Sequence, residues 1–397
     1  MKNKQDYVKV AFVGGGTGGH IYPGLAVADE LRKICKNNNI NLKVCWIGNS
    51  VGMDKSIVEK NIDQFGEKSA DVFYGIPSGK LRRYFSIRNF FDLFKIFAGF
   101  IVSFFVLLKE KPKVLFSKGG FVSVPPCICA KLLKIPVYTH ECDFTPGLAT
   151  KINSKFVKNI LISYEETASY FSKSIAQKTI VTGNPVRPVF YTADAKKGLE
   201  FLEVDKENLK KPILLVLGGS LGAKQINDLV KENLDWLCSK FFVVHQTGEK
   251  NVDDAKVQNV SSEVELNYKS YPFIYSQMPD VIAASDVILS RAGANSIWEC
   301  ATLGKPMVLV PLCGSGTRGD QEDNASFFEK SGGALVLARE NATSEKLKEC
   351  LDIMSDASKR ESFVQANYSL TKNTNPAEKI AKSNPESNEY SFSSCTM

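Results

Sequence analysis

The stretch GGGTGGH, Gly14 to His20, follows a short apolar run from Val8 to Val13 and opens an amphipathic segment. The stretch GGSLGA, Gly218 to Ala223, repeats this arrangement roughly 200 residues later, after the apolar run Ile213 to Leu217. A strand, a glycine turn and a helix in this order place backbone N–H groups and the positive end of a helix dipole where an anion can bind. Two such turns indicate two phosphorylated ligands, or one ligand between two domains.

The length of 397 residues exceeds a single comfortable core and predicts two domains. Apolar runs alternate with helical patterns along the whole chain, which predicts an α/β protein with parallel sheets covered on both faces. The expected strands are Val8–Val13, Val44–Ile47, Val114–Phe116, Val137–Thr139, Ile160–Ile162, Ile213–Leu217, Phe241–His245, Val287–Ser290 and Met307–Pro311.

The expected domains are two Rossmann-like halves, 1–186 and 187–375, followed by a short helix and frayed tail at 376–397. They meet at TGNPVRPVF, Thr182 to Phe190, where two prolines disfavour a helix and indicate a hinge. A helix over roughly Asp194 to Phe201 is expected to open the second half.

Charge is unevenly distributed along the chain. Residues 1–190 carry 27 Lys and Arg against 14 Asp and Glu, a net +13, whereas the remainder carries −6. The first half is therefore expected to face an anionic partner. Ten scattered cysteines without a CxxC pair favour a reducing cytoplasm over a disulfide scaffold or a structural zinc site, and no export signal is apparent.

The segment from 79 to 113 combines eight phenylalanines with basic residues. Its uninterrupted apolar stretch, Ile96 to Leu108, is shorter than the roughly 20 residues that span a bilayer, so no membrane span is expected. Leu93 to Leu108 fits a core helix, while Leu81 to Phe91 fits a surface helix in an anionic lipid interface. The expected membrane-facing residues are Arg82, Arg83, Phe85, Arg88, Phe90 and Phe91.

The first turn contains GxGxxG at Gly14, Gly16 and Gly19, a pattern that alone is a weak sign of dinucleotide binding. The acid that would hold the ribose in such a site is missing, because Val44–Ile47 is followed by Gly48, Asn49 and Ser50. A turn with a histidine at its end better suits an anionic ligand plus proton transfer, although a capping or packing role for His20 is equally compatible.

All three histidines, His20, His140 and His245, lie at the ends of expected strands, where ligands bind in open α/β sheets. The run His-Glu-Cys-Asp, His140 to Asp143, invites a metal interpretation. Adjacent side chains on an extended segment point to opposite faces, so we expect no metal site there. The turn SKGGFVS, Ser117 to Ser123, adds further backbone N–H groups for an anion.

In the second half, SRAGANSIWE leads from a strand into a helix. Glu299 there is placed to accept two hydrogen bonds from a ribose diol, or merely to compensate the helix dipole. Gln321, in RGDQEDNA, suits sugar hydroxyls.

Together these motifs resemble the MurG-type enzymes, the cytoplasmic UDP-N-acetylglucosamine:lipid I N-acetylglucosaminyltransferases of peptidoglycan synthesis. The motifs GGGTGGH, SKGGFVS, HECD, GNPVR, GGSLGA, HQTG, RAGANSIWE and DQEDNA occur in the family's order, over about Val8 to Ala381. The resemblance implies a GT-B fold with two Rossmann-like domains facing a central cleft. It also implies inverting transfer of N-acetylglucosamine to the C4 hydroxyl of the muramoyl sugar of lipid I, giving lipid II and UDP.

The resemblance further implies site residues. Arg187 and Ser220 would meet the donor diphosphate, Ile274 the uracil, Glu299 the ribose and Gln321 the sugar. The full implied UDP-N-acetylglucosamine set is Thr17, Gly18, Gly19, Asp143, Arg187, Ser220, Ile274, Ala294, Asn295, Ser296, Ile297, Trp298, Glu299 and Gln321. The family commonly shows His-Glu-Gln-Asn where this chain has Cys142 and Asp143, so Asp143 binds the donor or accepts a proton.

The expected mechanism uses no cofactor. No Asp-x-Asp pair ends a strand, so we expect a metal-independent enzyme in which a helix N-terminus and Arg187 meet the charge on UDP. His20 is the first candidate for the general base and Asp143 the second. The acceptor diphosphate is expected at Gly15, Gly16, Gly119 and Gly120, with its polyprenyl tail toward the basic, Phe-rich surface.

The implied setting is the cytoplasmic face of the bacterial cell membrane, with an anionic inner leaflet and other cell-wall synthesis proteins as partners and no nucleic acid. Two other functions remain open from the sequence. A UDP-N-acetylglucosamine 2-epimerase shares the two-domain architecture and needs no lipid acceptor, and a non-catalytic nucleotide-sugar sensor would bind the donor without releasing UDP.

Overall fold

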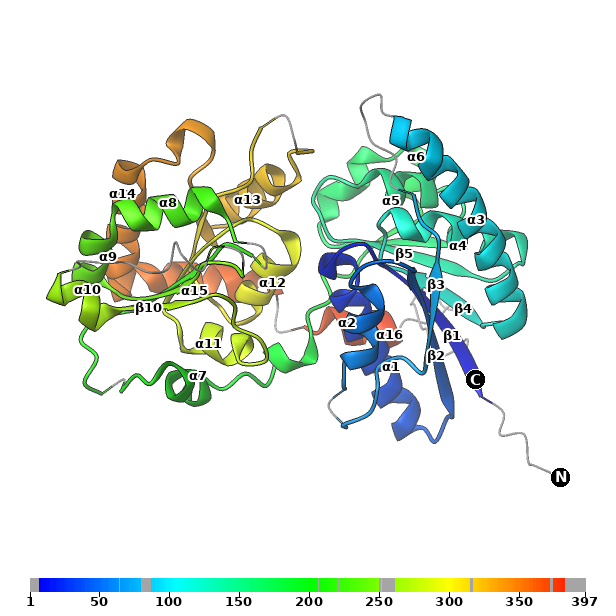
Figure 1. The fold of residues 1–397 in the computed structure, drawn as a ribbon, viewed down its shortest axis with the longest axis horizontal. Coiled ribbons are helices and arrows are strands. Elements are labelled where there is room, and N and C mark those ends of the chain that lie inside the picture. Colours follow the sequence, from blue (N-terminus) through cyan, green and yellow to red (C-terminus); the bar gives the residue numbers. More distant parts are fainter. Residues whose placement is uncertain are drawn as a thin grey trace. The chain divides into compact units, whose positions relative to one another are not determined.

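The computed structural model describes residues 7–63, 65–79, 87–205, 207–219, 222–249, 251, 261–314, 317–371 and 374–382, without the side chains of 87–89 and 91. The chain divides into two compact units. Unit 1 comprises Met1–Pro188 and Thr374–Met397, and unit 2 comprises Val189–Asn373. Each unit has a parallel sheet with helices packed against it (Figure 1).

The described part of unit 1 contains seven strands: β1 (Val8–Val13), β2 (Leu42–Asn49), β3 (Val72–Ile76), β4 (Val114–Ser117), β5 (Val137–Glu141), β6 (Asn159–Ile162) and β7 (Thr179–Val181). Its α-helices are α1 (Tyr22–Asn37), α2 (Asp54–Lys60), α3 (Ile87–Glu110), α4 (Val124–Leu132), α5 (Leu148–Asn153), α6 (Lys173–Ala176) and α16 (Pro376–Lys382). Short 3-10 helices occupy Gly18–His20, Phe121–Ser123 and Glu165–Tyr170.

The described part of unit 2 contains six strands: β8 (Ile213–Leu217), β9 (Phe242–Gln246), β10 (Tyr268–Tyr271), β11 (Val287–Ser290), β12 (Met307–Leu309) and β13 (Ala334–Val336). Its α-helices are α7 (Ala195–Leu202), α8 (Lys224–Glu232), α9 (Leu234–Lys240), α10 (Ser262–Asn267), α11 (Met278–Ala284), α12 (Ala294–Thr302), α13 (Asp320–Lys330), α14 (Ser344–Ser355) and α15 (Ala357–Thr371).

Both sheets have the doubly wound strand order. Unit 1 runs β3-β2-β1-β4-β5-β6-β7 and unit 2 runs β10-β9-β8-β11-β12-β13, with every pair parallel. The order therefore reverses between β1 and β4 in unit 1, and between β8 and β11 in unit 2. Ligands bind outside the carboxyl ends of the strands at such reversals. The glycine turns predicted from the sequence follow these strands.

The central strands are largely apolar because both faces of each sheet are covered. In β1, Val10 and Phe12 enter a core with α1, whereas Ala11 and Val13 enter a second core on the opposite face with α3 and α4. This alternation follows from the two-residue period of a strand.

Helix α16 returns the end of the described chain to unit 1. Ala377, Ile380 and Ala381 are fully buried in the core that α1 covers, and α16 lies beside α1 in Figure 1. The Asn375 amide donates to Glu30 at 3.0 Å, and Lys379 donates to the Val181 carbonyl at 2.8 Å. A short helix was expected here, and the structure has one. It was expected to lie outside both domains, but its small apolar face completes the core of unit 1.

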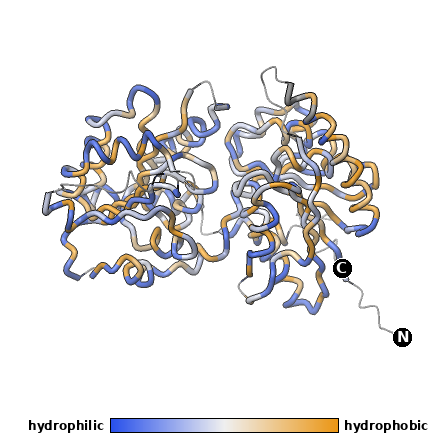
Figure 2. Tube along the Cα trace, in the orientation of Figure 1, coloured by the Kyte–Doolittle hydropathy of each residue, from blue (hydrophilic) through white to orange (hydrophobic). Residues whose placement is uncertain are grey.

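Helix α3 is only partly a core helix. Leu107 is buried and Phe100 and Phe104 pack against the core, whereas a stripe on the other face is exposed: Leu93, Phe94, Phe97, Ile101, Phe105 and Leu108. Figure 2 shows apolar residues along its whole length. The core prediction for Leu93 to Leu108 therefore holds for one face alone. Among the helices that the structure describes, none is long and apolar enough to cross a membrane.

Candidate active site

The two glycine turns of unit 1 interlock at the strand-order reversal. The first follows β1 and the second follows β4, its neighbour in the sheet. A Cβ on Gly120, whose φ is +78°, would lie 2.9 Å from the His20 ring and 3.0 Å from the Gly15 carbonyl oxygen. Any side chain at Gly14 would overlap the His20 backbone. These contacts require glycine and hold the His20 imidazole against the second turn.

Two of the four glycines predicted for the acceptor diphosphate use their N–H groups inside the protein. Gly16 donates to both carboxylate oxygens of Asp54 at 3.0 Å, and Gly119 donates to the Ser117 hydroxyl at 3.2 Å. Internal acceptors take the N–H groups of Gly16 and Gly119, so the place of these two residues in the acceptor diphosphate site stays a prediction without support from their N–H groups. The N–H groups of Gly15 and Gly120 make no hydrogen bond to the described residues.

Asp54 is the residue that sequence reasoning missed. Its buried carboxylate also accepts the Asn49 N–H at 2.7 Å, so it ties the end of β2 to the first turn. Burial raises the pKa of this carboxyl, while the hydrogen bonds from Asn49 and Gly16 lower it. Asp54 does not follow β2 directly but stands at the first position of α2, where a helix N-terminus favours a carboxylate.

The third turn of the site follows β5. The Glu141 carboxylate accepts the N–H groups of Cys142, Asp143 and Gly147 at 2.9 to 3.1 Å. These hydrogen bonds turn the chain after β5, and Asp143 is partly exposed beside the turn that follows β4.

The geometric reason given above against a metal here is wrong. Because the chain turns after β5, the ligand atoms of Glu141, Cys142 and Asp143 lie within 4.8 Å of one another. Their chemistry is a poor match for a metal: Glu141 is bound to three N–H groups, and burial raises the pKa of Cys142 to about 12. A thiol must lose its proton to bind a metal.

Two of the three histidines are buried and structural. His140 donates from Nε2 to the Gly183 carbonyl at 2.9 Å, and burial, followed by the positive charge of Lys118, holds its pKa well below the usual value. His245 lies between Asn227 and Tyr268, and burial lowers its pKa to about 4. His20 alone of the three is partly exposed at the turns.

Arg187 lies beside the first turn. Its guanidinium stacks on the Tyr22 ring, with 5.1 Å to the ring centroid, and the Tyr22 ring in turn contacts the side of the turn at Gly18. Thr17 is exposed, and Gly18 and Gly19 are partly exposed, at the same place.

In unit 2, the glycine turn after β8 includes Gly219 and Gly222, both with positive φ. Gln246, at the end of β9, donates to the Gly219 carbonyl at 3.4 Å and accepts the Ile274 N–H at 2.9 Å. Ile274 is buried, and this bridge connects it to the turn. Ser220 lies outside the described residues.

The predicted run on α12 divides into two faces. Asn295, Ser296 and Glu299 reach the surface, whereas the side chains of Ala294, Ile297 and Trp298 are buried. Trp298 packs edge-on against Phe328, at 5.4 Å between ring centroids. The helical repeat turns the side chains of Ile297 and Trp298 into the core, so these residues would reach a ligand through their backbone, and their place in the donor site stays a prediction.

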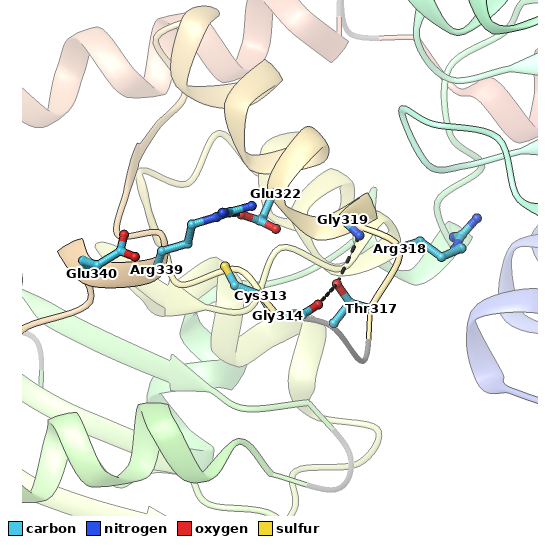
Figure 3. Close-up of a pocket in the computed structure, with 8 residues that line it drawn as sticks. All are labelled: Cys313, Gly314, Thr317, Arg318, Gly319, Glu322, Arg339 and Glu340. Carbon is cyan, nitrogen blue, oxygen red and sulfur yellow. Dashed lines mark hydrogen bonds and ion pairs between the residues drawn. The ribbon is translucent and has the colours of Figure 1, made fainter. Parts of the chain in front are cut away.

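Gln321 is the second residue of α13, and its side-chain oxygen accepts the Leu312 N–H at 3.0 Å. Asn324 is buried and donates to the Ala292 carbonyl at 3.2 Å, which connects α13 to the turn before α12. A pocket of about 830 Å³ lies alongside (Figure 3). The Arg339–Glu322 ion pair, at 2.6 Å, contributes to its wall, and the remaining lining residues are Cys313, Gly314, Thr317, Arg318, Gly319 and Glu340.

Of the predicted membrane-facing residues, Arg82, Arg83 and Phe85 lie outside the described residues. Arg88 and Phe91 lie within α3, but their side chains are not described. Phe90 is exposed and packs edge-on against Phe94, which is part of the exposed stripe.

Family models match both halves of the chain. The glycosyltransferase family 28 N-terminal domain matches residues 10–162, and the C-terminal domain of the same family matches residues 213–383. The chain is 54% identical, over 84% of each chain, to a Treponema denticola protein named UDP-N-acetylglucosamine--N-acetylmuramyl-(pentapeptide) pyrophosphoryl-undecaprenol N-acetylglucosamine transferase. It is 45% identical, over 91% of each chain, to a Treponema pallidum protein of the same name.

Among solved structures, MurG from Acinetobacter baumannii superposes with a TM-score of 0.65 over 93% of this chain and 96% of that one, at 24% identity. This likeness supports the fold, and the α/β, GT-B prediction is confirmed. The sequence relatives confirm the resemblance drawn from the motifs. The chain therefore belongs to glycosyltransferase family 28, among its MurG-type members.

Proposed function

We propose that this protein transfers N-acetylglucosamine from UDP-N-acetylglucosamine to the C4 hydroxyl of the muramoyl sugar of lipid I, giving lipid II and UDP in peptidoglycan synthesis. The Treponema relatives carry the name of this transferase. The observation in the structure that best supports the proposal is the pair of interlocked turns after β1 and β4, which combine free N–H groups with a partly exposed histidine.

Unit 1 is proposed to bind the acceptor and unit 2 the donor. Within unit 1, the N–H groups of Gly15 and Gly120 are the remaining candidates of the four glycines for the diphosphate of lipid I. Within unit 2, the turn before α8 and the exposed face of α12 flank the reversal between β8 and β11, the usual place for a nucleotide. We assign Glu299 to the ribose, Ile274 to the uracil and Gln321 to the sugar.

The proposed reaction is a direct displacement at the anomeric carbon. The acceptor C4 oxygen forms a bond to C1 of N-acetylglucosamine, the bond from C1 to the UDP oxygen breaks, and the configuration inverts. The acceptor proton passes to a base, for which His20 is the first candidate. Its Nδ1 is buried. Asp143 is the second candidate.

UDP leaves with additional negative charge, which preorganised donors must stabilise. We propose that the turn containing Ser220, the N-terminus of α8 and Arg187 do so without a metal ion. The engagement of Glu141 with three backbone N–H groups supports this, because it removes the buried carboxylate most suited to hold a cation.

The test is UDP release by the purified protein in EDTA, with and without a lipid I analogue. We expect release that depends on the acceptor and persists in EDTA. Conversion of the donor without acceptor would instead favour an epimerase, and donor binding without turnover would favour a sensor. Activity restored only by added Mg²⁺ would contradict the metal-independent mechanism.

We infer a peripheral position at the cytoplasmic face of the cell membrane. The relatives' names specify an undecaprenol-linked acceptor, and α3 presents Phe94, Phe97, Ile101 and Phe105 on one exposed face. Aromatic and aliphatic side chains at this spacing suit insertion among lipid headgroups.

The double variant Phe94→Ser/Phe97→Ser is expected to weaken pelleting with anionic vesicles at least about tenfold, because each buried phenylalanine contributes roughly 1.5–3 kcal/mol. Leu266→Ser, at a leucine that is 75% exposed in unit 2, is the control. The triple variant Arg82→Glu/Arg83→Glu/Arg88→Glu tests the charge contribution separately. Unchanged pelleting of both the double and the triple variant would refute the assignment of this surface to the membrane.

A further inference from the structure

Lys118 is a buried lysine at the centre of the site. It follows β4, so it lies between the turns after β1 and β5, and only 1% of it is exposed. Its N–H donates to the Val13 carbonyl at 2.8 Å, and its Cβ lies close to Gly14 in the first turn. A four-carbon stem keeps the amino group within one side-chain length of these turns.

The Lys118 amino group makes no hydrogen bond of normal geometry and no ion pair among the described residues, although the Cys142 thiol lies close enough to interact with it. The two carboxylates on the β5 turn do not pair with it: Glu141 accepts three backbone N–H groups, and no ion pair joins Lys118 to Asp143. A buried unpaired charge is costly, typically several kcal/mol. A protein tolerates such a cost most readily where a ligand supplies the missing counter-charge.

Two of the buried residues nearest to Lys118, Cys142 and His140, are neutral rather than charged. Burial raises the pKa of Cys142 to about 12, although the Lys118 charge opposes this, so the thiol keeps its proton. Burial and the Lys118 charge hold the pKa of His140 well below its usual value, so this imidazole is uncharged. Neither of these two residues supplies a counter-charge for the Lys118 amino group.

Unpaired backbone donors lie in the turns that flank Lys118. The N–H groups of Gly15 and Gly120 make no hydrogen bond within the described chain. After the second turn, α4 begins at Val124 and extends nine residues, so the positive end of its dipole faces the same region. Amides, a helix N-terminus and a fixed cation together favour a ligand with more than one negative charge.

We propose that Lys118 is the buried counter-charge for a diphosphate ester bound at the Gly15 and Gly120 turns. The inference rests on the proposed function, since the diphosphate in question is that of the lipid-linked acceptor. Lys118 acts through the electrostatic field at the turns, without touching the ligand. It is a positioning residue for the acceptor, in addition to the residues assigned above.

The test compares the full-length protein with Lys118→Met, which keeps the length of the side chain but removes its charge. The expected result is a KM for the lipid I analogue that rises roughly 10- to 100-fold, with kcat and the KM for UDP-N-acetylglucosamine within about threefold of the original. Lys131→Met removes the same charge from an exposed position on α4 and is the matched control. It should leave all three constants unchanged.

A thermal measurement gives a readout independent of activity, with inorganic pyrophosphate as the probe. Pyrophosphate is expected to raise the Tm of the unmodified protein and of Lys131→Met, but not that of Lys118→Met. Without ligand, Lys118→Met should melt at the same temperature as the unmodified protein or higher, because an unpaired buried charge has been removed. Lys118→Gln is measured in parallel.

The proposal is overturned if Lys118→Met keeps the original acceptor KM and pyrophosphate response. It is also overturned if both variants at Lys118 fold poorly, or lose kcat and both KM values together, because that pattern indicates a structural role. Failure of the proposed function looks different: the unmodified protein itself would show no pyrophosphate response and would use an acceptor without the diphosphate equally well.

Discussion

Replacing His20 with glutamine is expected to lower kcat by roughly 10²- to 10⁴-fold, the usual contribution of a positioned general base. The physical reason is that His20 is the partly exposed histidine of the site, whereas His140 and His245 are buried and held neutral. Glutamine keeps a polar group near the position of Nε2 but does not accept the proton. The KM for UDP-N-acetylglucosamine should change little, since the residues assigned to the ribose, the uracil and the sugar, Glu299, Ile274 and Gln321, lie in unit 2.

The measurement is single-turnover and steady-state kinetics of UDP release across pH, with Asp143→Asn as the comparison. Loss of kcat in His20→Gln together with loss of the acidic limb of the pH profile supports His20 as the base. A large loss in Asp143→Asn with near-normal His20→Gln would transfer the role to Asp143. The Tm of His20→Gln must stay close to that of the unmodified protein, because the ring packs against Gly120.

The second large effect concerns stability and Asp29. This residue of α1 is 5% exposed, and its Oδ1 has no hydrogen-bond partner among the described residues. Burial raises its pKa to about 7; Asp63 and Glu30 also raise it, while Ser69 and Arg32 lower it. Asp29→Asn is expected to stabilise the protein at pH 8 by up to about 4 kcal/mol and to have little effect near pH 4.

The sign follows from proton binding in the two states. Between about pH 4 and pH 7 the folded protein keeps the Asp29 proton while the unfolded chain has lost it, so the free energy of unfolding falls as the pH rises through this range. Above about pH 7 the carboxylate is charged in both states, and the full cost of burying it is present. Asparagine has no proton to lose and removes this dependence.

Urea unfolding at pH 5 and pH 8 measures the effect, with Asp228→Asn as the control. Asp228 pairs with Lys224 on the exposed face of α8, where an ion pair contributes little. We expect Asp29→Asn to gain stability over the unmodified protein at pH 8 and much less at pH 5. An equal difference at both pH values would show that Asp29 does not hold its proton in the folded state.

The central strands were predictable because burial on both faces makes them largely apolar, as in Ile213–Leu217 and in Val8–Val13, where Lys9 is the one polar residue. The strands that were missed, β3, β7, β10 and β13, lie at the edges of the two sheets. Edge strands are covered less completely and carry a weaker apolar signal. Strand β3 even contains an exposed glycine, Gly75, and β10 has no fully buried residue.

The residues of the candidate site were more predictable than the hydrogen bonds among them. The glycine motifs identified the turns correctly, because a positive φ and close contacts, with the Phe121 ring at Gly16 and with the His20 ring at Gly120, exclude other residues there. The sequence could not indicate which N–H groups stay free. That depends on Asp54, which is 38 residues from Gly16 along the chain. The pairing of β1 with β2 brings its carboxylate to the Gly16 N–H.

The sequence alone determined the α/β class, the division into two Rossmann-like halves, the turns at the strand ends and the family. These features depend on local periodicity and on the order of the motifs. Only the tertiary structure decided that Lys118 is buried without an ion pair among the described residues, that α16 completes unit 1 and that α3 exposes one apolar face. The physical reason is that charge pairing, burial and solvent exposure are set by neighbours from distant segments. A lysine, a small apolar helix or a phenylalanine does not carry that information in its local sequence.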